Sequence, residues 1–190
     1  GTMARRDDLL KFGEKHNLKV GTIADLIDYK LSKESTVENV HTKEVSTEFG
    51  EFRLDVWRDV IFDEHHFSLT KGSPEKADVP MVRVQTQSVL QDTLGIDEIG
   101  KKWSIRKSLQ KISEEGTGVF VLINHRDAKT YWLSSLKDEN IEPKRNRRVI
   151  GIGSQILRSL GLSRINVLGT PTKYSGLSGF NIEIEGFIDE

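Results

Sequence analysis

Two basic side chains occupy positions where proteins commonly bind anions. Arg148 closes a basic run at residues 144–148 and precedes an apolar stripe that predicts a helix over 148–160. The stripe consists of Ile152, Ile156, Leu157 and Leu160. Backbone N–H groups at a helix N-terminus attract anions, so Arg148 could reach a ligand held there. Lys173 lies in a loop after an apolar strand at 165–168, at the sheet end where α/β proteins collect ligands. These residues could bind a phosphate group.

The histidines are the other candidates for chemistry. His65 and His66 are adjacent in a segment, residues 64–69, that predicts a strand. Neighbouring strand residues point to opposite faces, so the pair would rarely share one metal ion. We interpret both as structural or surface residues. The same interpretation holds for His16, His41 and His125.

Composition limits the classes of function. The chain has 190 residues, 36% hydrophobic and 30% charged, which is enough for one buried core. It contains no cysteine, which excludes disulfides and favours a cytoplasmic location. A net charge of −1 gives no general attraction to nucleic acid or to an anionic membrane. No apolar run approaches the roughly 20 residues that cross a bilayer.

The middle of the chain, residues 82–123, has the pattern of a strand–loop–helix–strand unit. Val82 and Val84 alternate in a short strand, and a helix is predicted over 101–115. One face of that helix carries Ile105, Leu109 and Ile112. The apolar run at 119–123 predicts a central strand buried on both faces. Further strands are predicted at 51–56, 64–69, 165–168 and 182–185, so we expect an α+β fold with a mixed sheet and packed helices.

This unit resembles GTP cyclohydrolase II, a zinc enzyme of riboflavin synthesis. Arg83-Val84 and Glu114-Glu115-Gly116 match motifs of that family. Three family cysteines do not remain, and their positions hold Ser88, Ile99 and Lys101. Catalytic zinc requires three protein ligands, and these side chains cannot supply them. The resemblance therefore implies a cyclohydrolase II-like domain whose zinc site is lost, with no catalytic residues and no metal.

The first residues resemble a different family. Two motifs are similar to the C-terminal tail of 3,4-dihydroxy-2-butanone 4-phosphate synthase. They are Gly1-Thr2-Met3-Ala4-Arg5 and Gly21-Thr22-Ile23-Ala24-Asp25-Leu26-Ile27. That family converts ribulose 5-phosphate with magnesium, and in many bacteria it is fused ahead of a cyclohydrolase II domain. We expect a helical tail over 1–31 with Leu9 and Phe12 facing inward, a linker over 32–46 and the cyclohydrolase II-like domain over 47–190. The chain would be the C-terminal part of a bifunctional riboflavin-biosynthesis protein.

The resemblance also defines a residual phosphate or nucleotide pocket, formed by Arg83, Arg148 and Lys173. Residues 125–129 replace a glycine-containing family motif, and Asn146 replaces an acid. If the family fold is kept, Arg148 and Lys173 converge on one cleft, with Lys144, Arg145 and Arg147 at its rim. The alternative is that Arg148 pairs with an internal carboxylate such as Glu98 or Glu142.

These observations favour a catalytically degenerate domain that acts as a structural or regulatory module on a fused synthase. The fragment would be inactive and its parent a lyase. The alternative is an active cyclohydrolase II, in which zinc activates water and GTP yields formate, pyrophosphate and a diaminopyrimidine ribosyl phosphate. We expect a homodimer, a weak GTP or phosphate ligand, no nucleic-acid or membrane partner, and no cofactor in this fragment. Magnesium is expected for the missing synthase domain.

Overall fold

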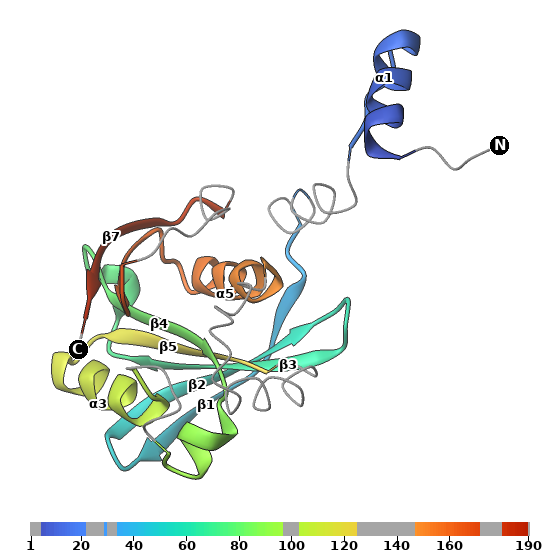
Figure 1. The fold of residues 1–190 in the computed structure, drawn as a ribbon. Coiled ribbons are helices and arrows are strands. Elements are labelled where there is room, and N and C mark those ends of the chain that lie inside the picture. The colour runs from blue at the N-terminus through green and yellow to red at the C-terminus, as the bar shows by residue number, and fades with distance from the viewer. Residues whose placement is uncertain are drawn as a thin grey trace.

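A seven-stranded sheet organises the chain from residue 34 onward (Figure 1). The computed structural model describes residues 5–21, 29, 34–96, 103–124, 147–171 and 180–189. The strand order in the sheet is β1-β2-β3-β5-β4-β6-β7. The strands are β1 (Val37–Thr47), β2 (Gly50–Asp59), β3 (Glu64–Lys71), β4 (Met81–Thr86), β5 (Gly118–Ile123), β6 (Arg164–Leu168) and β7 (Glu183–Ile188).

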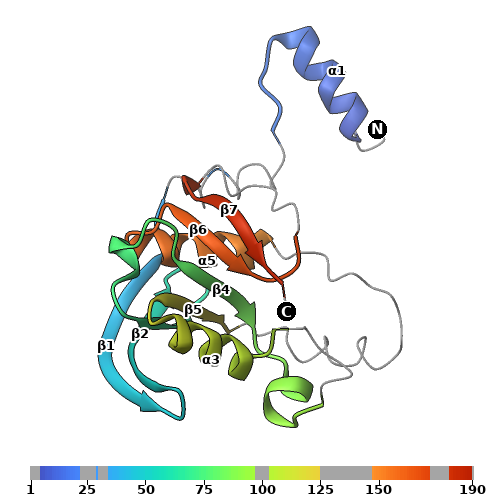
Figure 2. The ribbon, with the colours of Figure 1, turned by 90° about the vertical axis from the view of Figure 1, so that its left-hand side faces the viewer.

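The sheet is mixed. Strands β1, β2, β3 and β5 pair antiparallel, whereas β5, β4, β6 and β7 pair parallel. Helix α3 (Ile105–Glu115) lies between β4 and β5 in the chain, and α5 (Arg147–Ser159) precedes β6. The two connections leave the β4–β5 pair in opposite directions, so the right-handed crossover rule puts their helices on opposite faces. Figures 1 and 2 show α3 and α5 on the two sides of the sheet.

Each face of the sheet has its own core. The cluster under α5 combines residues of that helix with alternate positions of the strands, including Trp57, Val82, Val119, Val121, Ile152 and Ile156. The cluster under α3 includes Phe52, Met81, Leu109, Ile112, Phe120 and Leu168. Strand β5 contributes to both, because successive side chains point to opposite faces. The prediction of a central strand buried on both faces is confirmed.

Local sequence explains where the helices begin and how closely they pack. The Ser104 hydroxyl accepts a hydrogen bond from Lys107 N–H and caps α3, which ends at Gly116 with φ 77°. Gly153 lets α5 approach β4, because a Cβ at this position would lie 2.8 Å from Val84 Cγ1. Two short helical turns lie between strands, η1 (Pro74–Lys76) and η2 (Val89–Thr93).

The N-terminal part departs from expectation in two respects. Strand β1 occupies residues 37–47, which we expected to lie mainly in a linker. Helix α1 (Arg6–His16) forms as predicted, but Leu9 and Phe12 are 47% and 53% exposed and do not face inward. Figure 2 shows α1 apart from the sheet, so the described residues offer this apolar face no surface to pack on. The helix expected at residues 22–27 falls outside the described residues.

Candidate functional site

The β2–β3 hairpin brings two acidic side chains together. Asp59 ends β2 and Glu64 begins β3, and the antiparallel register places them directly opposite each other. Residues paired in this way point to the same face, with Cβ atoms about 5 Å apart. Both residues are buried, Asp59 at 2% and Glu64 at 7% exposure. Burying two adjacent carboxylates as anions is costly unless a cation pairs with them.

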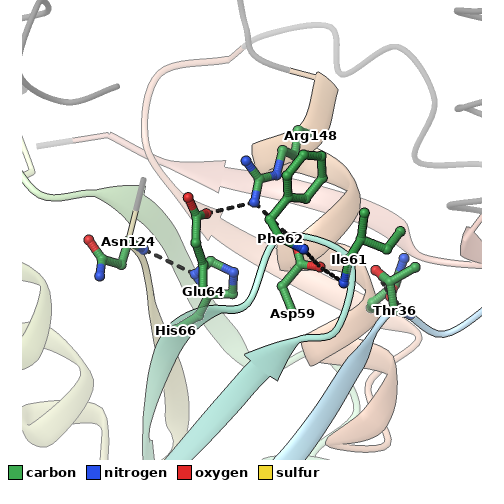
Figure 3. A network of polar contacts seen from close by, with 9 residues as sticks. Thr36, Asp59, Ile61, Phe62, Glu64, His66, Asn124 and Arg148 are labelled. Carbon is green, nitrogen blue, oxygen red and sulfur yellow. Dashed lines mark hydrogen bonds and ion pairs between the residues drawn. The ribbon is translucent and has the colours of Figure 1, made fainter. Parts of the chain in front are cut away.

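Arg148 supplies this cation from the first turn of α5. Its Nη2 atom lies 3.1 Å from Asp59 Oδ2 and 2.6 Å from Glu64 Oε2 (Figure 3). The ring of Phe62 covers the guanidinium, with its centroid 3.6 Å from Arg148 Cζ. One arginine therefore ties the helix to both strands of the hairpin.

The turn between the strands is ordered by the same carboxylate. Asp59 Oδ1 accepts hydrogen bonds from the backbone N–H groups of Ile61 and Phe62, at 2.9 and 3.3 Å. This is the local pattern by which aspartate stabilises turns. It also holds the Phe62 backbone where its ring can cover Arg148. The turn conformation and the ion pair are therefore coupled through Asp59.

His66 lies on the same face and is fully buried. Its Nδ1 atom accepts a hydrogen bond from Asn124 N–H at 3.2 Å, so the neutral imidazole carries its proton on Nε2. That Nε2 atom is buried without a hydrogen-bond partner. Burial lowers the pKa of His66 below its ordinary value of 6.5, against the opposing attraction of Asp59 and Glu64. The neighbouring His65 is exposed on the opposite face, as the adjacent-residue argument predicted.

We call Asp59, Phe62, Glu64, His66 and Arg148 the Arg148 cluster. An anion approaching this guanidinium would also meet two carboxylates at ion-pair distance, which opposes binding of a phosphate. The cluster can exchange a proton at His66 and can hold the α5 N-terminus against the hairpin. Among the described residues, no group of three or more histidine and acidic side chains could hold a metal ion.

Arg83 has a separate location. Its neighbours in β4, Val82 and Val84, face α5, so Arg83 points to the opposite face, away from Arg148. Its guanidinium donates to Gln85 Oε1 at 2.9 Å, to the Leu168 carbonyl at 2.6 Å and to the Trp103 carbonyl at 3.2 Å. The structure therefore does not bring Arg83 and Arg148 into one pocket. Arg83 connects β4 to β6 and to the start of α3.

The structure describes some of the other residues that the sequence analysis singled out, and not the rest. Arg148 opens a helix, as predicted, and its carboxylate partners are Asp59 and Glu64. Ser88 precedes η2, and its backbone N–H donates to Asp92 Oδ2 at 2.7 Å. The remaining positions lie outside the described residues: Lys173, Ile99, Lys101, Glu98, Glu142, Lys144, Arg145, Asn146 and residues 125–129. A phosphate ligand and a homodimer stay predictions.

Sequence reasoning missed Asp59 and Glu64. Asp59 ends β2 and Glu64 begins β3 five residues later, but their pairing depends on the hairpin register, which the strands predicted at 51–56 and 64–69 did not give. A hairpin register that pairs these two positions would have placed both acids on one face.

A family model described as GTP cyclohydrolase II matches residues 38–189. The chain belongs to the GTP cyclohydrolase II family. The match begins at the second residue of β1 and ends after β7, so it includes all of the sheet except Val37.

The relatives of this family member carry another enzyme's name. The chain is 36% identical over 192 residues to a 3,4-dihydroxy-2-butanone 4-phosphate synthase of Pseudomonas syringae pv. tomato, covering 97% of the chain and 52% of that protein. It is 37% identical over 189 residues to a synthase of the same name from Neisseria meningitidis serogroup B, covering 98% and 52%. A riboflavin biosynthesis protein of Aquifex aeolicus is 33% identical over 200 residues, covering 97% and 49%.

A solved structure gives the same result. A two-domain 3,4-dihydroxy-2-butanone 4-phosphate synthase from A. baumannii matches with a TM-score of 0.70 and 34% identity. The match covers 100% of this chain and 51% of that one. The chain thus spans about half the length of the relatives it matches.

These findings correct the identification made from the sequence. We expected the C-terminal part of a bifunctional protein, with a degenerate cyclohydrolase II domain acting as a structural or regulatory module. Relatives that match nearly the whole chain are instead named as the synthase itself. The three missing cysteines led us to expect a degenerate domain, and the tail motifs led us to expect a fusion. Relatives with the synthase name match both parts of the chain.

The coarse fold prediction is confirmed and the finer one is not. The structure has the expected mixed sheet with a few packed helices. The solved structure that it matches is a synthase, so the structural comparison does not confirm a cyclohydrolase II-like architecture. The division into domains at residues 31 and 46 stays a prediction. Within the described ranges, no helix has the length and apolar character needed to cross a membrane.

Proposed function

We propose that the chain is a domain of a 3,4-dihydroxy-2-butanone 4-phosphate synthase. The proposal is based on how much of the chain the relatives with this name match. Relatives with this name match at least 97% of the chain, so their similarity includes most of the residues before 38, where the family match begins. The synthase relationship therefore extends over α1 as well as over the sheet.

The reaction belongs to a protein about twice the length of this chain. Its product is 3,4-dihydroxy-2-butanone 4-phosphate, as the relatives' names state. The resemblance of the first 31 residues implies ribulose 5-phosphate as the substrate and magnesium as the metal. The described residues of this domain contribute a folded sheet and the Arg148 cluster to the whole enzyme.

Magnesium does not fit the described residues. Mg²⁺ prefers octahedral oxygen coordination that includes one or two carboxylates. The adjacent buried carboxylates of the Arg148 cluster are engaged by the guanidinium. The described ranges contain no group of three or more histidine and acidic side chains that could hold a metal ion. The described carboxylates of this domain therefore do not form a magnesium site.

Genetic complementation tests the proposal. A bacterial strain that lacks its own synthase requires riboflavin, and expression of the full-length protein should restore growth without it. A known synthase serves as the positive control and the empty vector as the negative control. Absence of growth, despite expression of the folded full-length protein and growth with the known synthase, would contradict the proposal.

A further inference from the structure

An open groove of about 570 Å³ lies between the β1–β2 hairpin and the C-terminal end of α5. It is separate from the Arg148 cluster. Arg53 and Trp57 line the groove from β2, and Leu160 lines it just beyond α5. Arg148 is at the other end of that helix, which at 13 residues is roughly 20 Å long. The volume is within the range of small-molecule sites.

A buried carboxylate organises the polar wall of the groove. Asp55 is 2% exposed, and its Oδ1 atom accepts hydrogen bonds from Asn39 Nδ2 at 3.1 Å and from Thr42 Oγ1 at 2.7 Å. Its Oδ2 atom accepts one from Arg53 Nε at 3.2 Å. These contacts fix three side chains of the groove before any ligand arrives, and they satisfy Asp55 itself. Asp55 is therefore a positioning residue.

Two charged groups in the groove remain available. Arg53 uses only Nε on Asp55, and no described residue accepts a hydrogen bond from its Nη atoms. The Arg53 side chain is 39% exposed, so the planar fork is accessible. Glu75 of η1 also lines the groove, and its carboxylate makes no ion pair with any described residue. The groove therefore presents one available cation and one available anion.

The balance of charge identifies the ligand class. Arg53, Asp55 and Glu75 sum to −1, which disfavours a simple anion even though the Arg53 fork suits a carboxylate. A simple cation would pair with Glu75 and leave Arg53 unused. A molecule with a carboxylate at one end and an ammonium at the other matches both groups. Leu160 gives its aliphatic part a small apolar surface, and the nearly buried Trp57 forms the wall beneath it.

We propose that this groove binds a small zwitterion of the amino-acid class, with its carboxylate on Arg53 and its ammonium on Glu75. Each contact is a charge-assisted hydrogen bond to a partly exposed side chain, so binding is weak. Loss of either contact should weaken it at least about tenfold. The site is independent of the synthase reaction.

The test uses isothermal titration of the full-length protein with the ω-amino acids from glycine to 6-aminohexanoate, which separate the two charges by increasing lengths. We expect one length to bind best. Hexanoate and hexylamine, which each carry one of the charges, should bind at least about tenfold more weakly. Equal binding of hexanoate would show an anion site, and equal binding of hexylamine a cation site, and either would overturn the proposal. Absence of binding by every ω-amino acid would overturn it too.

Matched variants locate the binding. Arg53→Gln and Glu75→Gln should each weaken the best ligand at least about tenfold. Glu75 contacts no structural ion pair among the described residues, so its variant tests the site even if Arg53→Gln perturbs folding. Arg58→Gln is the control, because Arg58 is on the same strand but pairs with Asp63 at the surface. Unchanged affinity in Glu75→Gln would overturn the assignment.

Discussion

The charge of Arg148 is balanced within the protein by residues far away in the sequence. Asp59 and Glu64 lie 89 and 84 positions from Arg148, and both are buried. A guanidinium held in this way contributes to stability mainly because its removal would leave two carboxylates unpaired in a low-dielectric environment. The Arg148 cluster is therefore primarily a structural element of this domain.

Replacement of Arg148 tests this role. Arg148→Met keeps much of the side-chain volume and removes the charge, so we expect the free energy of unfolding to fall by about 3 kcal/mol. Urea denaturation of the full-length protein, followed by fluorescence, measures the change. Arg158→Met is the matched control, because Arg158 is on the same helix and exposed, and its effect should stay within about 0.5 kcal/mol. Equal effects of the two substitutions would show that the ion pairs contribute little.

The lowered pKa of His66 should make the stability of the protein depend on pH. Its pKa is lowered in the folded state by burial, so below pH 6.5 the unfolded chain binds a proton that the folded chain resists. This contribution to stability is full above pH 6.5 and is lost as the pH falls from there toward the folded-state pKa. The slope from this one residue is at most about 1.4 kcal/mol per pH unit.

The measurement compares unfolding free energies at pH 7.5 and 5.5. Wild type should lose more stability on acidification than His66→Gln does, whereas His65→Gln should behave like wild type because His65 is exposed. The same acid sensitivity in wild type and His66→Gln would assign the effect to other groups.

The regular elements were predictable where one face of each is buried. The 3.6-residue stripe in α5 and the apolar run of β5 each identified their element to within a residue or two. Strand β1 was missed because it is an edge strand with most side chains exposed, so its sequence shows no alternation. The partners of Arg148 were missed for a different reason. They depend on a hairpin register and on a helix docking across the sheet, and neither leaves a local pattern.

Packing between elements gives a third prediction. Gly153→Ala places a methyl group 2.8 Å from Val84 Cγ1, between α5 and β4. We expect this overpacking to cost about 1–3 kcal/mol. Helix propensity offsets about 1 kcal/mol of that cost, so the net destabilisation should be up to about 2 kcal/mol. Thermal unfolding of single and double variants measures the coupling.

Adding Val84→Ala should recover part of the loss, because it removes the contacting methyl groups. The double variant should therefore be more stable than the sum of the two single effects predicts. Strict additivity would mean that α5 does not press on β4 at this position.

At the scale of the whole molecule, the chain spans about half the length of the relatives it matches. The GTP cyclohydrolase II family model matches nearly the whole sheet of this chain. The relatives that are named for a different reaction match the chain over about half of their own length. Family membership thus describes the sequence of this domain, whereas the proposed activity belongs to the complete enzyme.

A direct assay of the reaction tests this account. Purified full-length protein is incubated with ¹³C-labelled ribulose 5-phosphate and Mg²⁺, with GTP in a parallel sample, and the products are followed by ¹³C and ³¹P NMR. We expect protein-dependent signals of 3,4-dihydroxy-2-butanone 4-phosphate and an unchanged GTP spectrum. Conversion of GTP with ribulose 5-phosphate left intact would contradict it.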